Sequence, residues 1–176
     1  VNNNTASITL VDIAQSAIDS MRRNIESSSS LQSSWMPSIH YVVRDMAQKR
    51  RSSSGDDMDD RDDTVGKHHI IHDRAVFHFL NHHAQDRVTY IDNVYHSLVD
   101  TCDAYVIVGT FALPDGPTMC SGLPITRYSE QSLREEWERD GRFELVMTRH
   151  ENHVTPSGSS QHFIFGLFKK VKMTAS

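Results

Sequence analysis

The 176-residue sequence predicts an α/β fold built on a doubly wound, mostly parallel sheet, and three features of its pattern support this class. Short apolar runs alternate with helical stripes along most of the chain, as in βαβ units. Residues 104–113 form an apolar run without alternation, which is typical of a central strand covered by helices on both faces. The first two apolar runs are followed closely by an aspartate, at the carboxyl strand ends where open α/β sheets bind ligands.

The first part of the chain predicts one parallel βαβ unit. Residues 8–11 form a β run that ends at Asp12, and apolar side chains at helical spacing follow from residue 14 to residue 25. A serine cluster ends this helix, and a second β run, residues 39–43, leads to Asp45. A strand, a helix and a strand in this order place the two strands parallel.

The second part predicts the rest of the sheet and a closing hairpin. Residues 69–72 form a third strand, a helical stripe spans residues 88–98, and the central strand covers residues 104–113. Leu133 and Trp137 mark another helix. Residues 143–147 and 161–168 are two strands joined by a turn at residues 155–158, so we expect a C-terminal antiparallel β hairpin.

Residues 47–66 interrupt this pattern with charges of both signs and almost no apolar side chains. Such a composition cannot bury enough surface to order itself, so we expect a disordered insertion, either a tolerated loop extension or a docking tail. The rest suits one domain over residues 1–176.

Composition limits the partners and the compartment. The net charge of −5, from 18 basic and 23 acidic residues, argues against nucleic acid as a partner. Cys102 and Cys120 form neither a paired motif nor a disulfide framework, and a reducing, cytoplasmic location fits best. The longest apolar run is far shorter than the ~18 residues a membrane helix needs, so no membrane association is expected.

Two strand ends carry candidate ligand-binding residues. Asp12 stands where an acidic side chain accepts hydrogen bonds from ribose hydroxyls, although an aspartate there also serves as a helix N-cap. Asp45 stands where a carboxylate accepts from an adenine amino group. We assign both, with the residues that follow them, Ile13 and Met46, to a nucleotide-like cofactor site.

The segment HDRAVFHFL follows the third strand and brings together several polar groups. His72, Asp73, Arg74 and His78 are placed to line the mouth of one pocket. The alternatives are a local Asp73–Arg74 ion pair and a histidine at position 78 that lies in the core or on the surface.

HDRAVFHFL, GTFALPDGPTMCSGLP and ITRYS closely resemble stretches of a group of class I S-adenosylmethionine-dependent methyltransferases, many of them bacterial. The resemblance implies a Rossmann-like seven-stranded sheet that ends in the hairpin, with S-adenosylmethionine as cofactor. It implies Asp12 on the cofactor ribose, Asp45 near the adenine, and His72 and Asp73 at the methionine end. The start Asp-Arg-Ala also resembles the aspartate-lysine-glycine motif of certain protein-lysine methyltransferases, so the methyl acceptor is a small molecule or a protein side chain.

Two departures from this family stand out. The family opens with a strand and a glycine-rich loop, whereas no Gly-x-Gly occurs among the eight glycines here. Relatives also carry Asp and Trp before HDRA, where this chain has His69 and Ile71. We therefore expect the first strand to be missing and the chain to be N-terminally incomplete. A methyltransferase-like scaffold that is inactive and binds a partner is the alternative function.

Methyl transfer from a sulfonium requires in-line positioning and, for some acceptors, a base. His72 or His78 is the predicted base. A zinc site formed by His78 and His82 at i, i+4 spacing, with His68 and His72 nearby, is a rival hypothesis. No HExxH or paired cysteine supports it, so we predict no metal.

Overall fold

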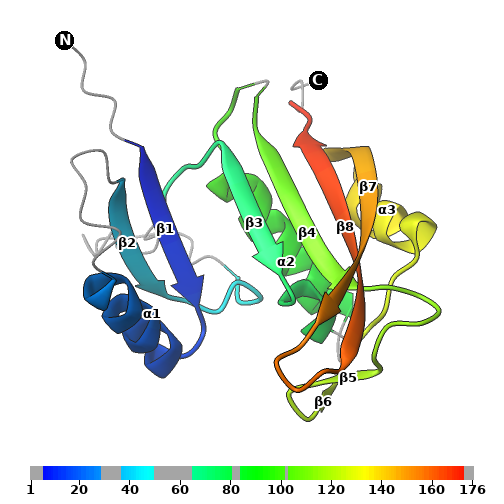
Figure 1. Ribbon diagram of the computed structural model, residues 1–176. Helices are drawn as coiled ribbons and strands as arrows, with labels where there is room; N and C mark the ends of the chain where they lie inside the picture. Colours follow the sequence, from blue (N-terminus) through cyan, green and yellow to red (C-terminus); the bar gives the residue numbers. More distant parts are fainter. Residues whose placement is uncertain (1–5, 29–36, 50–64, 81–83, 102, 173–176) are drawn as a thin grey trace. The chain divides into compact units, whose positions relative to one another are not determined.

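The computed structural model describes residues 6–28, 37–49, 65–80, 84–101 and 103–172 (Figure 1). The chain divides into two compact units, one formed by Val1–Met46 and Arg50–Gly66, the other by Ala47–Lys49 and Lys67–Ser176. Residues 50–64 of the predicted insertion lie outside the described part.

The first unit is the predicted parallel βαβ arrangement. Strand β1 (Ser7–Asp12) leads into helix α1 (Gln15–Ser27) and then strand β2 (Ser38–Val43). The strands pair parallel from Ser7 opposite Ser38 to Asp12 opposite Val43. Ile18, on the apolar stripe of α1, is 1% exposed and is the buried anchor of the helix. The prediction of a strand, a helix and a parallel strand is confirmed.

The second unit is a four-stranded sheet with two α-helices, and its strands lie in the order β3-β4-β8-β7 (Figure 1). Its elements are β3 (Ile70–Arg74), the 3-10 helix η3 (Phe77–Phe79), α2 (Ala84–Ser97), β4 (Tyr105–Phe111), β5 (Met119–Cys120), β6 (Leu123–Pro124), α3 (Glu130–Glu138), β7 (Phe143–Val154) and β8 (Ser160–Lys170). β3 and β4 are parallel, whereas β8 is antiparallel to both β4 and β7. The predicted C-terminal hairpin is therefore present.

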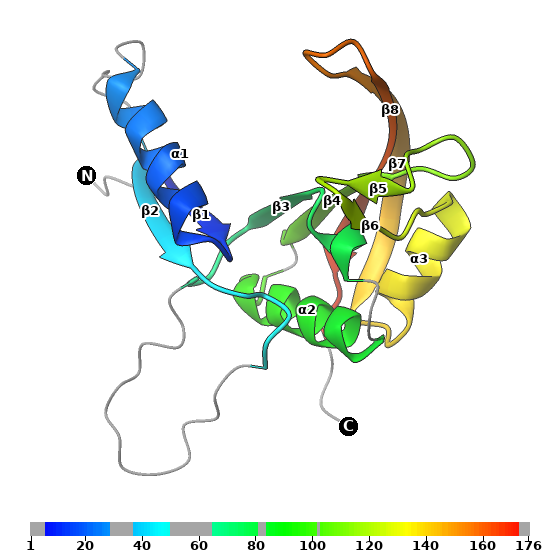
Figure 2. The same cartoon turned by 90° about the horizontal axis from the view of Figure 1, so that it is seen from below.

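One face of this sheet carries the core of the second unit, and α2 and α3 lie against it (Figure 2). Val106 and Val108 on β4 have no exposed surface. Trp137 on α3 stacks on Phe168 of β8 with ring centroids 5.4 Å apart. A Cβ at Gly166 would meet the Leu133 side chain at 3.1 Å and the Phe168 ring at 2.6 Å, so glycine allows α3 to approach the sheet closely.

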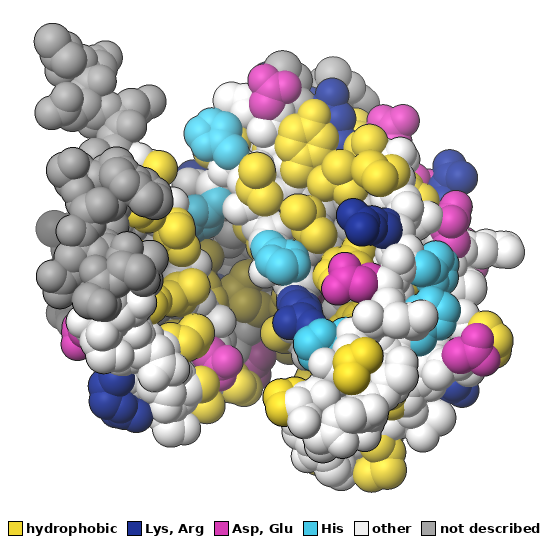
Figure 3. Space-filling model, in the orientation of Figure 1, with side chains coloured by type: hydrophobic (Ala, Val, Ile, Leu, Met, Phe, Trp, Pro, Cys, Tyr) yellow, Lys and Arg dark blue, Asp and Glu magenta, His cyan; other side chains and the backbone are white. Residues whose placement is uncertain are grey.

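The opposite face of the four-stranded sheet is less covered. Ile70 on β3 is 62% exposed and Met147 on β7 is 54% exposed, while Ile107 and Phe165 between them are half-buried. Figure 3 shows hydrophobic side chains gathered over β4 and β8 on this face. The apolar run of β4 predicted helices on both faces, but within the second unit the described helices lie on one face only.

A short β hairpin lies between β4 and α3 and was not predicted. β5 and β6 pair antiparallel and are joined by Ser121 and Gly122, whose φ angles are 50° and 79°. Two successive residues with positive φ are what a two-residue hairpin turn requires. Strands of two residues are too short to give a periodic signal, so the sequence indicates only a turn here.

None of the described helices combines the length and the apolar character required to cross a lipid bilayer.

Candidate functional site

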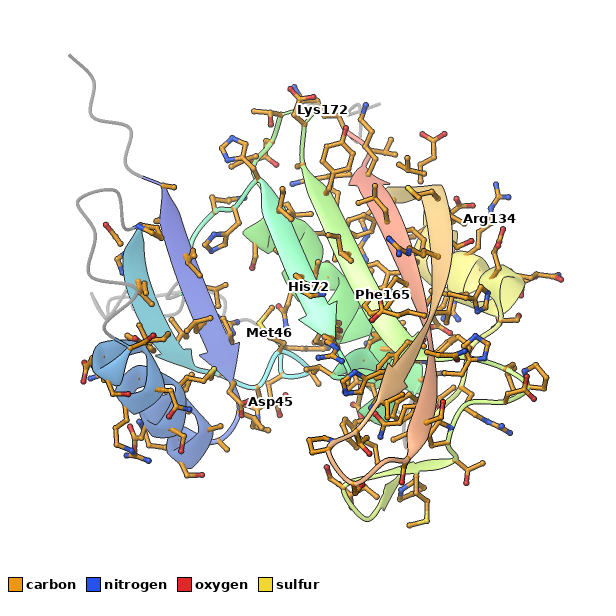
Figure 4. The ribbon with its side chains drawn as sticks, viewed as in Figure 1. Asp45, Met46, His72, Arg134, Phe165 and Lys172 are labelled. Atoms are coloured by element: carbon orange, nitrogen blue, oxygen red, sulfur yellow. The ribbon has the colours of Figure 1, made fainter. Side chains whose placement is uncertain are left out.

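The first unit brings two of the predicted acidic residues to the same sheet edge. Because β1 and β2 are parallel and in register, their carboxyl ends lie side by side. Asp12 is the last residue of β1, and Asp45 follows β2 by two residues. Figure 4 shows Asp45 and Met46 on the segment that leaves β2. The predicted pairing of Asp12 and Asp45 at adjacent strand ends agrees with this topology.

One of the two oxygens of the Asp12 carboxylate accepts a hydrogen bond from a described residue. Its Oδ1 accepts a hydrogen bond of 2.8 Å from the Ala14 N–H and so fixes the turn between β1 and α1. The N-cap of α1 is Ala14, so Asp12 holds the approach to the helix and is not its N-cap. The second oxygen, Oδ2, has no hydrogen-bond partner among the described residues. Ile13, the next residue, is 67% exposed.

The carboxyl end of β3 in the second unit is organised around Asp73, which is 4% exposed. Its Oδ1 accepts from the Val76 N–H at 2.9 Å, and its Oδ2 accepts from the Phe77 N–H at 3.0 Å and the Tyr90 hydroxyl at 2.8 Å. Ala75 between them has a φ of 64°, in the left-handed region that disfavours a side chain. The carboxylate therefore holds a strained turn in place and accepts from the first N–H of η3, whose N-cap residue is Val76.

Burial raises the pKa of the Asp73 carboxyl, because desolvation penalises its charged form. The hydrogen bonds from Tyr90, Val76 and Phe77 oppose this shift, as does the nearby His72. The segment after the turn is anchored by Phe77, which is fully buried and lies 5.2 Å from the Trp137 ring, centroid to centroid. Both oxygens of Asp73 thus have partners inside the protein.

His72 and Arg74 lie on the other side of β3 from Asp73, because successive side chains of a strand point to opposite faces. Both are exposed, and His72 is seen on β3 in Figure 4. The Arg74 guanidinium lies over the Phe163 ring, 5.4 Å from its centroid. Because Asp73 and Arg74 point to opposite faces and have other partners, the alternative of a local ion pair between them is not observed.

His78 lies inside the second unit. Its side chain has no exposed surface, and neither ring nitrogen has a hydrogen-bond partner among the described residues. The imidazole stacks on Phe111 with centroids 4.9 Å apart and meets the Phe79 ring edge to face. Burial lowers its pKa to about 4, so the ring is neutral at physiological pH.

The four polar groups of HDRAVFHFL therefore do not line one pocket. Asp73 and His78 are buried, whereas His72 and Arg74 are exposed. His82, part of the rival zinc hypothesis, lies outside the described residues. Within the described ranges, no group of three or more His, Cys, Asp or Glu side chains is arranged to hold a metal ion.

Tyr90 is the important residue of this region that sequence reasoning missed. Asp73 binds backbone N–H groups that are only three and four residues later, so this local contact was within the reach of sequence reasoning. Tyr90 lies 17 residues after Asp73, and only the packing of α2 against β3 brings its hydroxyl to the carboxylate.

Comparisons with known proteins place the fold. No family model matches the sequence, and no curated protein matches it. A solved S-adenosylmethionine-dependent methyltransferase from Methanosarcina mazei is similar with a TM-score of 0.67 at 15% identity, over 95% of this chain and 83% of that one. A second, from Clostridium acetobutylicum, gives a TM-score of 0.57 at 10% identity, over 93% and 75% of the two chains.

A third similar structure is the 1,6-didemethyltoxoflavin-N1-methyltransferase of Burkholderia thailandensis, solved with bound 1,6-didemethyltoxoflavin and S-adenosylhomocysteine. Its TM-score is 0.56 at 16% identity, over 93% of this chain and 61% of that one. At these identities the likenesses establish the architecture alone. The chain has the Rossmann-like fold of class I methyltransferases, with a C-terminal antiparallel hairpin.

Proposed function

We propose that this protein is an S-adenosylmethionine-dependent methyltransferase that acts on a small molecule or a protein side chain. The observation that carries the proposal is the state of Asp12. Its side chain ends a parallel strand of a class I methyltransferase fold, is fixed through one oxygen, and keeps the other without a described partner. A carboxylate held in this way is suited to accept hydrogen bonds from a ribose hydroxyl.

The residues of the first unit fit the nucleoside half of the cofactor. Asp12 would accept from the ribose, and Asp45, at the end of the neighbouring strand, from the adenine amino group. The exposed Ile13 and the half-buried Met46 would offer apolar contacts to the flat base. This set therefore combines two hydrogen-bond acceptors with two apolar side chains.

The residues of the second unit fit a different role. We assign His72 to proton removal from the acceptor, since its imidazole is exposed on β3. Asp73 acts as a positioning residue in this proposal, because its three internal hydrogen bonds fix the turn beside His72. Of the two predicted bases we retain His72, because the buried ring of His78 has no surface through which to reach an acceptor.

The cofactor, when bound, supplies an electrophilic methyl group on a sulfonium that is already a good leaving group. The protein then has to hold the acceptor in line with that methyl and take up the acceptor's proton where it has one. In this proposal the bound cofactor would supply the methyl group, its methyl–sulfur bond would break to leave a neutral thioether, and the His72 imidazole would take up the proton that the acceptor loses.

Calorimetric titration with S-adenosylmethionine and S-adenosylhomocysteine tests the cofactor assignment. Asp12→Asn keeps an acceptor oxygen for the Ala14 N–H and replaces the other oxygen by an amide, so the fold is retained while the ribose acceptor is lost. Loss of a hydrogen bond to a charged group costs about 1.5–3 kcal/mol, so we expect affinity to fall about 10-fold to 150-fold.

The matched control is Asp19→Asn on α1, where the carboxylate accepts a bond from the Gln15 side chain on the exposed surface. It should leave the affinity unchanged. Equal affinity of the wild-type and Asp12→Asn proteins would overturn the assignment of Asp12.

A second candidate function rests on the glycines. The 176 residues contain no Gly-x-Gly, the pattern that lets a backbone loop approach the methionine part of the cofactor. A methyltransferase-like scaffold that binds a partner protein has no need of that loop. Failure of the wild-type chain to bind either cofactor form, with its fold intact, would favour the scaffold.

A further inference from the structure

Two histidines face each other across the C-terminal hairpin. In the register of β7 and β8, His150 lies opposite Ile164 and Asn152 lies opposite His162. His150 and His162 are therefore diagonal neighbours on the same face of the hairpin. The Nδ1 of His150 and the Nε2 of His162 are 3.1 Å apart, and the ring centroids are 5.1 Å apart.

This separation suits two ligands of one metal ion. Imidazole nitrogens bind zinc at about 2.0–2.1 Å. Two such nitrogens are therefore about 2.9–3.4 Å apart when the nitrogen–metal–nitrogen angle lies between its octahedral and its tetrahedral value. In the metal-free protein one ring must donate an N–H to the other, because two facing lone pairs would repel. A metal ion binds in place of that shared proton once both facing nitrogens are deprotonated and each has a free lone pair.

The surroundings leave room for further ligands. His150 is exposed and His162 is half-buried, so water reaches the space beside them. Asn152, directly across from His162, has no side-chain hydrogen bond to the described residues, and its amide oxygen is available as a third ligand. Arg149 and Glu151 alternate with His150 and point to the opposite face of β7.

We propose that His150 and His162 form a binding site for a divalent transition-metal ion of the zinc class, with water completing the coordination. Imidazole ligands select zinc, copper and nickel over magnesium and calcium, which prefer oxygen. The bound ion joins β7 and β8 near the turn that connects them. The His162 carbonyl accepts a hydrogen bond of 2.9 Å from the Ala112 N–H, so the bound ion also restrains the backbone that follows β4.

The test uses the untagged full chain, stripped with a chelator and titrated with zinc chloride. Nitrogen-edited NMR of the imidazoles identifies which of the 11 histidines respond. We expect His150 and His162 to shift together at one equivalent of zinc, and zinc to raise the melting temperature. His150→Ala and His162→Ala should each weaken binding at this site at least tenfold and remove the rise in melting temperature.

His153→Ala is the matched control. His153 lies on the same strand opposite Gln161, and its ring approaches the edge of Phe163 at 6.4 Å on the other face. Its zinc affinity should equal that of the wild type. His150→Thr, which preserves strand propensity, separates loss of the ligand from local loss of the strand.

Three results would overturn the site: no response of the two imidazoles at millimolar zinc, unchanged affinity in the His150→Ala/His162→Ala protein, or equal loss in His153→Ala. None of these readouts depends on methyl transfer or on cofactor binding.

Discussion

Replacing the buried His78 by leucine should remove a large part of the pH dependence of stability. The ring is fully buried with both nitrogens unpartnered, and its pKa lies at about 4. In the unfolded chain a histidine titrates near ~6.5. The folded state therefore binds a proton less readily than the unfolded state. The contribution of His78 to the free energy of unfolding is fully present above the unfolded pKa and is lost as the pH falls toward the folded pKa.

The size of the effect follows from the two pKa values. A difference of about two and a half units is worth roughly 3 kcal/mol when fully expressed, because each unit corresponds to about 1.4 kcal/mol. Between pH 8 and pH 5 the loss attributable to His78 is about 2 kcal/mol, since the folded ring is still mostly neutral at pH 5. The raised pKa of Asp73 acts in the opposite direction, but it is common to both proteins and cancels in their difference.

The assay is urea unfolding of the wild-type and His78→Leu proteins at pH 8, 7, 6 and 5. Trp137 packs in the core of the second unit, so its fluorescence reports that unit once Trp35 is replaced by phenylalanine in both proteins. We expect the free energy of unfolding of His78→Leu, relative to the wild type, to rise by about 2 kcal/mol from pH 8 to pH 5. A difference that does not change with pH would show that the ring is solvated or partnered in the folded protein, and would refute the reasoning.

Two further substitutions test the contacts that hold the second unit together. Tyr90→Phe removes one of the three hydrogen bonds to the buried Asp73 carboxylate and should cost about 1.5–3 kcal/mol by urea unfolding, whereas Tyr105→Phe, whose hydroxyl has no described partner, should change little. Lys170, 3% exposed, donates to two backbone carbonyls at the end of α2 at 2.9 Å each. Lys170→Met should therefore cost about 2 kcal/mol or more, and Lys169→Met on the opposite face of β8 should not; equal effects within either pair would contradict these contacts.

Local patterns were enough to predict most of the secondary structure. The helical stripe over residues 14–25 and the β run that ends at Asp12 each depend on residues a few positions apart, and β1, α1 and β2 formed close to the expected residues. β7 extends to Val154, well beyond the predicted residue 147. It lies at the edge of the sheet, and its second half carries polar side chains that give no hydrophobic period.

The candidate site was predictable only in part, because local patterns do not encode how distant elements pack. Strand order and parallel register put Asp12 and Asp45 at one edge, and a βαβ pattern specifies both features. The prediction that HDRAVFHFL lines one pocket was wrong, because successive side chains of a strand point to opposite faces and the strand is followed by a turn with a positive φ at Ala75. That turn carries His78 into the core, away from the exposed His72.

The sequence by itself determined the order of the elements, the parallel βαβ unit and the closing hairpin, because these follow from periodicity and turn residues within short windows. Only the tertiary structure decided which polar side chain is buried and what satisfies it. Tyr90 and Lys170 form hydrogen bonds to partners 17 and 70 or more residues away along the chain. The ring nitrogens of His78 have no hydrogen-bond partner among the described residues. Burial depends on the packing of distant elements, which no local pattern encodes.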